Sequence, residues 1–298
     1  MVIDKPLAEQ WLPNVGYYRL SAYWHPARKI SSDGESLLDE FESGTSFNDV
    51  VDLYESDRKL RTLIHDGIER IEIAMRAQLT DYLCLNPVND PQAYLSGERF
   101  RPTFNHLEWM SAIYGRMNRA SRRSEAITHY STEYGGQYPL WVIAECMDFK
   151  DISKLYSGLY SSEQRNIADR IGLSFDLQDL SKNNKEKVQD RHPWANWMEQ
   201  LTIVRNTAAH HGRMWNRSFV PATTVALRTK PAFANLPPKQ SERIFGTLIV
   251  MSHVLRIVSP GTTWPSKVAH LLDQSFLTNP LVQFSSLGIP DTWDRKTL

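Results

Sequence analysis

Apolar side chains recur at every third or fourth position over most of the chain, and strict alternation is almost absent. That spacing indicates amphipathic helices rather than strands. The clearest helix is predicted from Asp57 to about Leu85, behind a start signal at Ser46 and Asp49 and ahead of Pro87. Its apolar stripe consists of Leu60, Ile64, Ile68, Ile71, Met75 and Leu79. We therefore expect an all-α protein.

Further helices are expected where a cap or a proline precedes an apolar pattern. Pro139 begins PLWVIAECMDF, which leads on to SKLYSGL, and an S-x-x-Q capping pattern at Ser161 begins a helix that stops before Gly172. Pro193 begins WANWMEQLTIVRNTAAHH, which Gly212 ends. The remaining helices are expected at about 103–120, 124–133, 241–258 and from 265 onward.

The chain divides into three parts on these patterns. Residues 1–45 form an N-terminal extension whose aromatics are expected to pack on the core, residues 46–220 form a helical core, and residues 221–298 form a C-terminal helical extension. The boundary before the last part follows from the prolines that punctuate the stretch up to 238. The aromatics of the first part are Tyr17, Tyr18, Tyr23 and Trp24.

Composition is that of an ordinary globular protein, with 34 basic and 34 acidic side chains among 298 residues. A polyanion partner must therefore be bound by a local patch rather than by the field of the whole molecule. Cys84 and Cys146 lie in apolar helical patterns without CxxC spacing, which indicates reduced thiols and a cytoplasmic location. The start lacks a secretory signal pattern, and the most apolar stretch, 244–258, is too short to span a membrane.

The stretch IVRNTAAHHGRMWNR at 203–217 carries the candidate chemistry. Arg205 offers a permanent cation with five donors, and His210 offers an imidazole that exchanges protons near neutral pH. Together they suit phosphoryl transfer, in which protons move at two oxygens while charge develops on others. Residues five apart lie about 140° apart around a helix, so either the last turn unwinds near Gly212 or the two side chains line opposite walls of a cleft. A two-fold dimer would bring two arginines and two histidines around one phosphate.

An alternative explanation is that Arg and His simply favour the carbonyl end of a helix. The neighbouring residues argue against it, because polar and aromatic groups with affinity for RNA follow at once. His211 also satisfies an Arg-x5-His spacing, and Trp215 is expected to stack an unpaired base. The candidate residues around the pair are Asn206, His211, Arg213, Trp215, Asn216 and Arg217.

RNTAAHHGRMWNR resembles the signature of the Abi-like proteins of bacterial abortive-infection systems, which carry an R-N-x-x-x-H element of the HEPN ribonuclease superfamily. The resemblance covers about residues 12–220. Other matching segments are YYRLSAYW at 17–24, SFNDVVDLYESDRKLR at 46–61, IERIEIAMRAQL at 68–79, HYSTEYGGQYPLWVIAEC at 129–146 and ISKLYSGL at 152–159. One departure is the Phe149-Lys150 step, where relatives tend to have Phe-Gly.

The resemblance implies a HEPN-like helical bundle that dimerises into a composite site and cleaves RNA without a metal. Arg205 and His210 match its catalytic pair, and Asn206 matches the residue that orients them. Products would carry 2′,3′-cyclic phosphate and 5′-hydroxyl ends. An antitoxin or a companion non-coding RNA that silences the enzyme is a further expected kind of partner.

Other patterns are less specific. Glu72 and Arg76 share a face of the long helix and are expected either to support the motif or to form an ordinary ion pair. Arg116, Arg119 and Arg123 would hold an RNA backbone or form a solvated face. No metal site and no nucleotide-binding loop is expected, since HExxH, CxxC and glycine-rich loops are missing. The alternatives to a ribonuclease are a non-catalytic RNA-binding or regulatory module and a helical protein-interaction scaffold.

Overall fold

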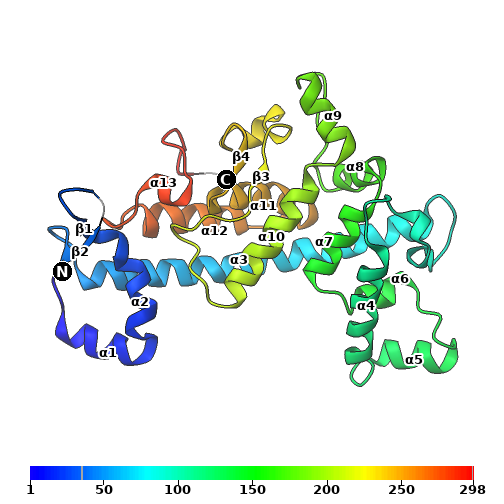
Figure 1. Ribbon diagram of the computed structural model, residues 1–298, viewed down its shortest axis with the longest axis horizontal. Coiled ribbons are helices and arrows are strands. Elements are labelled where there is room, and N and C mark those ends of the chain that lie inside the picture. Colours follow the sequence, from blue (N-terminus) through cyan, green and yellow to red (C-terminus); the bar gives the residue numbers. More distant parts are fainter. Residues whose placement is uncertain (35, 297) are drawn as a thin grey trace.

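A single long helix, α3 (Phe47–Leu85), is the axis of the molecule. The computed structural model describes residues 1–34, 36–296 and 298 of the chain. The 39 residues of α3 span about 58 Å at 1.5 Å per residue, and the other elements pack along it (Figure 1). The helix begins ten residues before the predicted start, because the Ser46 side chain accepts from the Asp49 amide while Asp49 accepts from the Ser46 amide.

The predicted apolar stripe of α3 is buried, from Leu60 to Leu79. The helices α10 (Trp194–Ala209), α11 (Ile244–Val258) and α12 (Trp264–Leu271) pack on it. At Gly67 the approach is so close that a β-carbon would lie 2.6 Å from a Met251 atom and 2.9 Å from the Trp264 ring. The neighbouring helices can therefore pack this closely on α3 only because residue 67 is a glycine.

The remaining elements confirm that the chain is mostly α-helical. The two sheets among the described residues are two-stranded and antiparallel: β1 (Arg28–Ile30) with β2 (Leu37–Phe41), pairing Ile30 with Leu37, and β3 (Ala222–Thr223) with β4 (Gln240–Ser241). The other α-helices are α1 (Lys5–Val15), α2 (Tyr17–Trp24), α4 (His106–Ala120), α5 (Glu125–Glu133), α6 (Leu140–Ala144), α7 (Phe149–Gly158), α8 (Ser161–Arg170), α9 (Lys182–Asp190) and α13 (Phe284–Leu287). Short 3-10 turns are η1 (His25–Ala27), η2 (Ala93–Leu95), η3 (Gly97–Arg99), η4 (Leu227–Thr229) and η5 (Pro231–Phe233), and η6 (Leu272–Phe276) is a π-helical turn.

Several local predictions are wrong. The helix expected from Pro139 ends at Ala144, and a separate helix begins after Asp148, which forms a capping box with Asp151. The cap expected at Ser161 lies one residue earlier, at Tyr160, whose amide donates to Glu163. Helix α9 forms in a polar stretch where no helix was expected.

The N-terminal aromatics divide between core and surface. Tyr23 and Trp24 are buried as expected, whereas Tyr17 and Tyr18 remain 68% and 91% exposed. The reason is helical geometry, because α2 turns only one face toward α3.

The C-terminal residues share the core of the rest of the chain. Phe245, Leu248 and Trp264 belong to the same cluster of buried side chains as the stripe of α3. None of the helices in the described part of the chain combines the length and apolar character needed to cross a membrane.

Candidate functional site at the end of helix α10

The segment singled out by its sequence lies at the carboxyl end of α10. The helix ends at Ala209, and the His210 amide still donates to the Asn206 carbonyl at 3.0 Å. His211 has a φ of +57°, a backbone conformation that residues other than glycine seldom adopt. Gly212 lies so close to the preceding turn that a β-carbon would be 3.0 Å from the Thr207 carbonyl oxygen. The helix therefore unwinds at the histidine pair.

The motif side chains point in different directions from α10. Val204 and Ala208 are buried, whereas Asn206 and His210 are exposed, and Arg205 is half-buried. Arg205 donates to the Asn206 side-chain oxygen at 3.3 Å. Among the described residues neither the His210 ring nor the His211 ring has a hydrogen-bond partner. Within one chain, Arg205 is therefore hydrogen-bonded to Asn206 but not to His210.

One carboxylate of α3, Glu72, lies near Arg205. Arg76 pairs with Glu72 at 2.5 Å and donates to the Met147 carbonyl at 2.6 Å. Burial raises the pKa of Glu72, and the positive charges of Arg76 and Arg205 oppose that shift. Glu72 is thus within electrostatic reach of both guanidinium groups, while Glu69, on the next turn of α3, is exposed.

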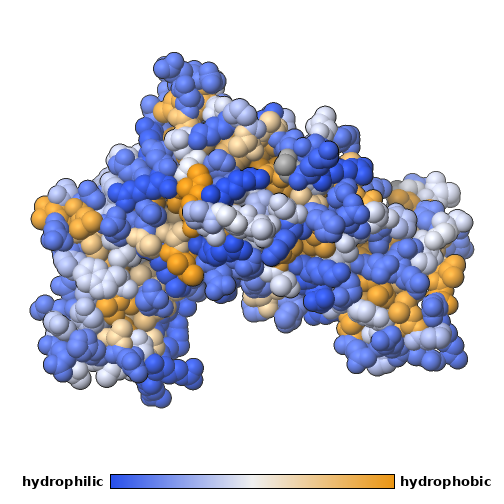
Figure 2. Space-filling model, turned by 180° about the vertical axis from the view of Figure 1, so that it is seen from behind, coloured by the Kyte–Doolittle hydropathy of each residue, from blue (hydrophilic) through white to orange (hydrophobic). Residues whose placement is uncertain are grey.

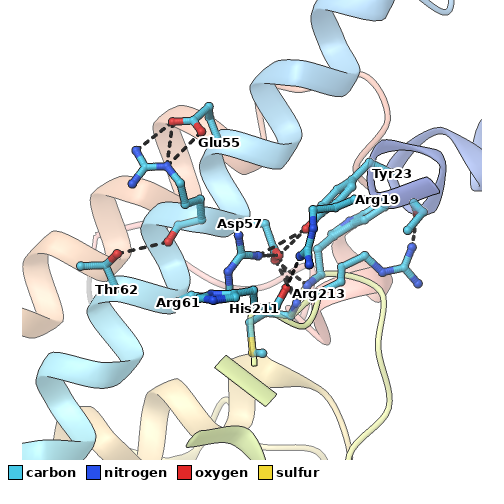
Figure 3. Close-up of polar contacts among 12 residues, drawn as sticks. Arg19, Tyr23, Glu55, Asp57, Arg61, Thr62, His211 and Arg213 are labelled. Carbon is cyan, nitrogen blue, oxygen red and sulfur yellow. Dashed lines mark hydrogen bonds and ion pairs between the residues drawn. The ribbon is translucent and has the colours of Figure 1, made fainter. Parts of the chain in front are cut away.

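The loop after the motif is anchored on a buried carboxylate, Asp57 of α3 (Figure 3). Its Oδ1 accepts from the amides of Met214 and Trp215 at 3.1 and 2.8 Å. Its Oδ2 accepts from the Tyr23 hydroxyl at 2.8 Å and pairs with Arg61 at 2.5 Å. Burial raises the pKa of Asp57, and Arg61 and the hydrogen bonds to the carboxylate oppose that shift. Both oxygens of the Asp57 carboxylate are thus occupied by hydrogen-bond donors, so the residue has a structural role.

Helix α2 holds the same loop from the other side. Arg19 donates to the His211 carbonyl at 2.8 Å, and Arg213 donates to the Ala22 carbonyl (Figure 3). Arg213 also donates to the Asn216 carbonyl at 3.3 Å. Burial lowers the pKa of Arg213. The unusual backbone of His211 is therefore fixed by a side chain from another helix.

Trp215 is not available for the base stacking expected of it. Only 1% of the residue is exposed, its ring stacks on Tyr23, and its indole N–H donates to Ser286 at 2.8 Å. Asn216 is half-buried and has a φ of +48°. Its backbone N–H donates to the Ser286 carbonyl at 3.1 Å. Arg217 is exposed, with its guanidinium 5.8 Å from the centre of the Phe219 ring.

Sequence reasoning missed Asp57, Tyr23 and Arg19. A signal existed for Asp57, because it falls in register with Leu53 and Leu60 on the buried face of α3, and a buried carboxylate requires partners. No comparable signal marked Arg19, which is exposed and meets a residue 192 positions away.

The motif end of α10 lies on a concave edge of the molecule. In Figure 1 the loop that follows α10 runs below α3, between α1 and α2 on one side and α4 and α5 on the other. Figure 2, seen from behind, shows that edge hollowed between two lobes. Arg116, for which either an RNA-binding face or a solvated face was expected, pairs with Asp148 and Asp151. Among the described residues there is no group of three or more His, Cys, Asp or Glu side chains placed to hold a metal ion.

Comparison with known families gives one match. The model of a family described as Abi-like protein matches residues 10–216, which is more than half of the chain and includes the R-N-x-x-x-H element at 205–210. No curated protein and no solved structure matches the chain.

Proposed function

The chain belongs to the Abi-like protein family, and from that premise we propose that it is a metal-independent endoribonuclease of the HEPN type, acting in a bacterial abortive-infection system. The family suggests an abortive-infection function. The ribonuclease assignment is supported above all by the end of α10, where His210 is exposed and Arg205 and Asn206 are in contact.

The proposed reaction is the in-line attack of a ribose 2′-hydroxyl on the neighbouring phosphorus. One histidine takes the proton of the 2′-hydroxyl, the new P–O bond forms, and the bond to the 5′-oxygen breaks. A second histidine gives its proton to that oxygen. Arg205 stabilises the charge that develops on the other phosphate oxygens. The products are a 2′,3′-cyclic phosphate and a 5′-hydroxyl, and DNA is not cut because it lacks the 2′-hydroxyl.

Two proton transfers require two imidazoles, and the proposal takes them from two copies of the chain. His210 of each copy and Arg205 of each copy would surround one phosphate. Glu72 would orient Arg205 through its charge, since the pKa of Glu72 responds to that guanidinium. His211 and Arg217, both exposed beside His210, would bind the flanking RNA, whereas Arg213 and Asn216 hold the loop.

Substitution of His210 distinguishes this function from plain RNA binding. His210→Ala should lower the cleavage rate by about 10²- to 10⁴-fold, the usual contribution of a proton-transferring side chain. Its affinity for an RNA with 2′-O-methyl groups throughout, which cannot be cleaved, should stay within a few-fold of the wild-type value. Wild-type protein that binds this RNA but does not cleave ordinary RNA would instead be a non-catalytic binding module.

The dimer is tested by dilution. Light scattering should give twice the chain mass at the concentrations where cleavage is measured, and activity per chain should fall once dilution separates the copies. Constant activity per chain in a strictly monomeric protein would contradict the composite site.

A further inference from the structure

A pocket of about 540 Å³ lies between α4, α7 and α10. Its volume is in the range of pockets that bind small organic ligands. Glu199, Thr202 and Ile203 of α10 form one wall, and α7 and the segment that leads into α4 form the others. The pocket therefore borders the helix that carries the motif.

The pocket has an excess of unpaired positive charge. Arg101, Lys150 and Arg191 line it, and none of them has a carboxylate within ion-pair distance among the described residues. The fourth cation, Lys154, is neutralised by Glu108 at 2.9 Å. Glu199 is the other carboxylate in the lining, so four cations and two carboxylates leave the pocket with a net excess of positive charge that favours an anion.

Arg191 differs from an ordinary surface arginine. Its Nε is buried without a hydrogen-bond partner in the described residues, while its terminal nitrogen reaches the Ser157 hydroxyl at 3.4 Å. A buried donor of this kind normally has a partner. An anionic group that enters the pocket would meet an already positioned guanidinium.

An aromatic ring forms the apolar part of the lining. Phe104 is half-buried and packs so closely on Gly158 that a β-carbon there would lie 2.7 Å from the ring. Phe100 and Trp109 hold the ring from other sides, with centroids 5.0 and 6.2 Å away. Phe104 is thus fixed in place, as a platform for stacking should be.

The pocket is continuous with the exposed face of α10 that leads to the motif. Ile203, Asn206 and His210 follow one another at helical spacings of three and four residues, so they share that face. Seven residues of helix correspond to about 10 Å. A strand whose phosphate lies at His210 can therefore place a nearby nucleotide in the pocket.

We propose that this pocket binds one unpaired nucleotide of the RNA strand, next to or one step beyond the cleaved linkage. The base stacks on Phe104, and Lys150, Arg101 and Arg191 contact the phosphate backbone. This inference rests on the proposed ribonuclease function and deepens it by naming a subsite.

The test measures binding of a fully 2′-O-methylated single-stranded RNA to the full chain. Lys150→Gln should weaken binding about three- to tenfold at low salt and reduce the slope of log affinity against log salt by about 0.7, the value for one lost contact to a single strand. Lys182→Gln is the matched control, because Lys182 is an exposed lysine of α9 that does not line the pocket. It should change neither quantity.

Phe104→Leu keeps an apolar side chain without a ring face and should weaken binding about tenfold, in the range of one lost base-stacking contact. A thermal melt checks that the variant is folded. Photocross-linking of the same RNA carrying 4-thiouracil gives a readout that does not depend on stability, and the cross-linked peptides should contain Phe104 or Lys150.

If both variants bind RNA with wild-type affinity and the cross-links lie elsewhere, the subsite is overturned. If His210→Ala nevertheless loses ribonuclease activity, the proposed function stands. A wild-type protein that neither cleaves RNA nor binds it at low salt overturns both proposals.

Discussion

The two ends of α10 each carry a histidine, in opposite surroundings. At the start, His192 is 1% exposed, its ring stacks on Phe175, and its Nδ1 accepts from the Trp194 amide at 3.2 Å. Burial lowers the pKa of His192 to about 4, so the ring is neutral. At the other end His210 is exposed, and its ring has no partner among the described residues. The buried, neutral ring of His192 holds the helix in place, whereas the exposed ring of His210 is free to transfer protons.

The same contrast separates the two acidic groups of α3 that lie near the motif. Asp57 is fully buried, and each of its oxygens is occupied by donors. Glu72 is partly open and lies near Arg205 as well as Arg76. In both pairs the structural residue is the more deeply buried one, so burial rather than residue type separates the two roles.

The largest effect is expected from Asp57→Ala. It leaves Arg61 buried without its carboxylate and removes the acceptor of two loop amides, which should lower the free energy of unfolding by about 3–5 kcal/mol. Urea unfolding measures it. The control is Asp52→Ala, an exposed site of the same helix, with an expected change of about 0.5 kcal/mol or less. Equal changes in both variants would refute the anchoring role.

The buried end of α10 predicts a pH dependence of stability. Because the pKa of His192 is about 4 in the folded protein and about 6.5 in the unfolded chain, the unfolded state binds more protons between these values. The contribution of the neutral His192 ring to the free energy of unfolding is therefore complete above about pH 6.5. It falls by roughly 3 kcal/mol as the pH is lowered toward 4. His192→Asn should flatten the curve of unfolding free energy against pH over that range. His270→Gln, at an exposed histidine, should leave the curve unchanged; a wild-type slope in His192→Asn would show that other groups cause it.

The open end predicts a loss of rate without a loss of stability. Arg205→Lys keeps the charge but removes the planar, multiple-donor geometry, so cleavage should slow about a hundredfold. Thermal melting should stay close to wild type. Arg58→Lys, at an exposed arginine of α3 that pairs with Glu55, should leave the rate unchanged. If Arg205→Lys cleaves RNA as fast as the wild type, a positive charge at that position is sufficient for cleavage and the account of the guanidinium geometry is contradicted.

The smallest effect is expected from Glu72→Gln. The amide can still accept from Arg76, but the charge beside Arg205 is lost, so kcat should fall about tenfold through misplacement of the guanidinium. Glu69→Gln, on the exposed face one turn away, should match the wild type. A KM effect with unchanged kcat would assign Glu72 to substrate binding instead.

Much of the fold follows from local pattern. The apolar stripe of α3 and the limits of α10 are visible in the sequence, because amphipathic spacing and caps act within a few residues. The break between α6 and α7 was missed, although Asp148 and Asp151 form a local cap, because the apolar run through Phe149 masked it.

The candidate site was only partly predictable. The order R-N-x-x-x-H marks the motif itself, but the burial of Trp215 depends on Tyr23 and Ser286, which are 192 and 71 residues away in the chain. A tryptophan in a polar stretch therefore resembled a surface residue. Contacts such as Arg19 with His211 arise only when α2 and α10 come together through α3.

The central claim is that the end of α10 cleaves RNA through the ribose hydroxyl. The most direct measurement compares an RNA oligonucleotide with the same oligonucleotide carrying a single 2′-deoxyribose at the mapped cleavage position. We predict that the substitution abolishes cleavage at that linkage alone and that the products from unmodified RNA carry 2′,3′-cyclic phosphate and 5′-hydroxyl ends. Undiminished cleavage at the deoxy position, or products with a 5′-phosphate, would contradict the account.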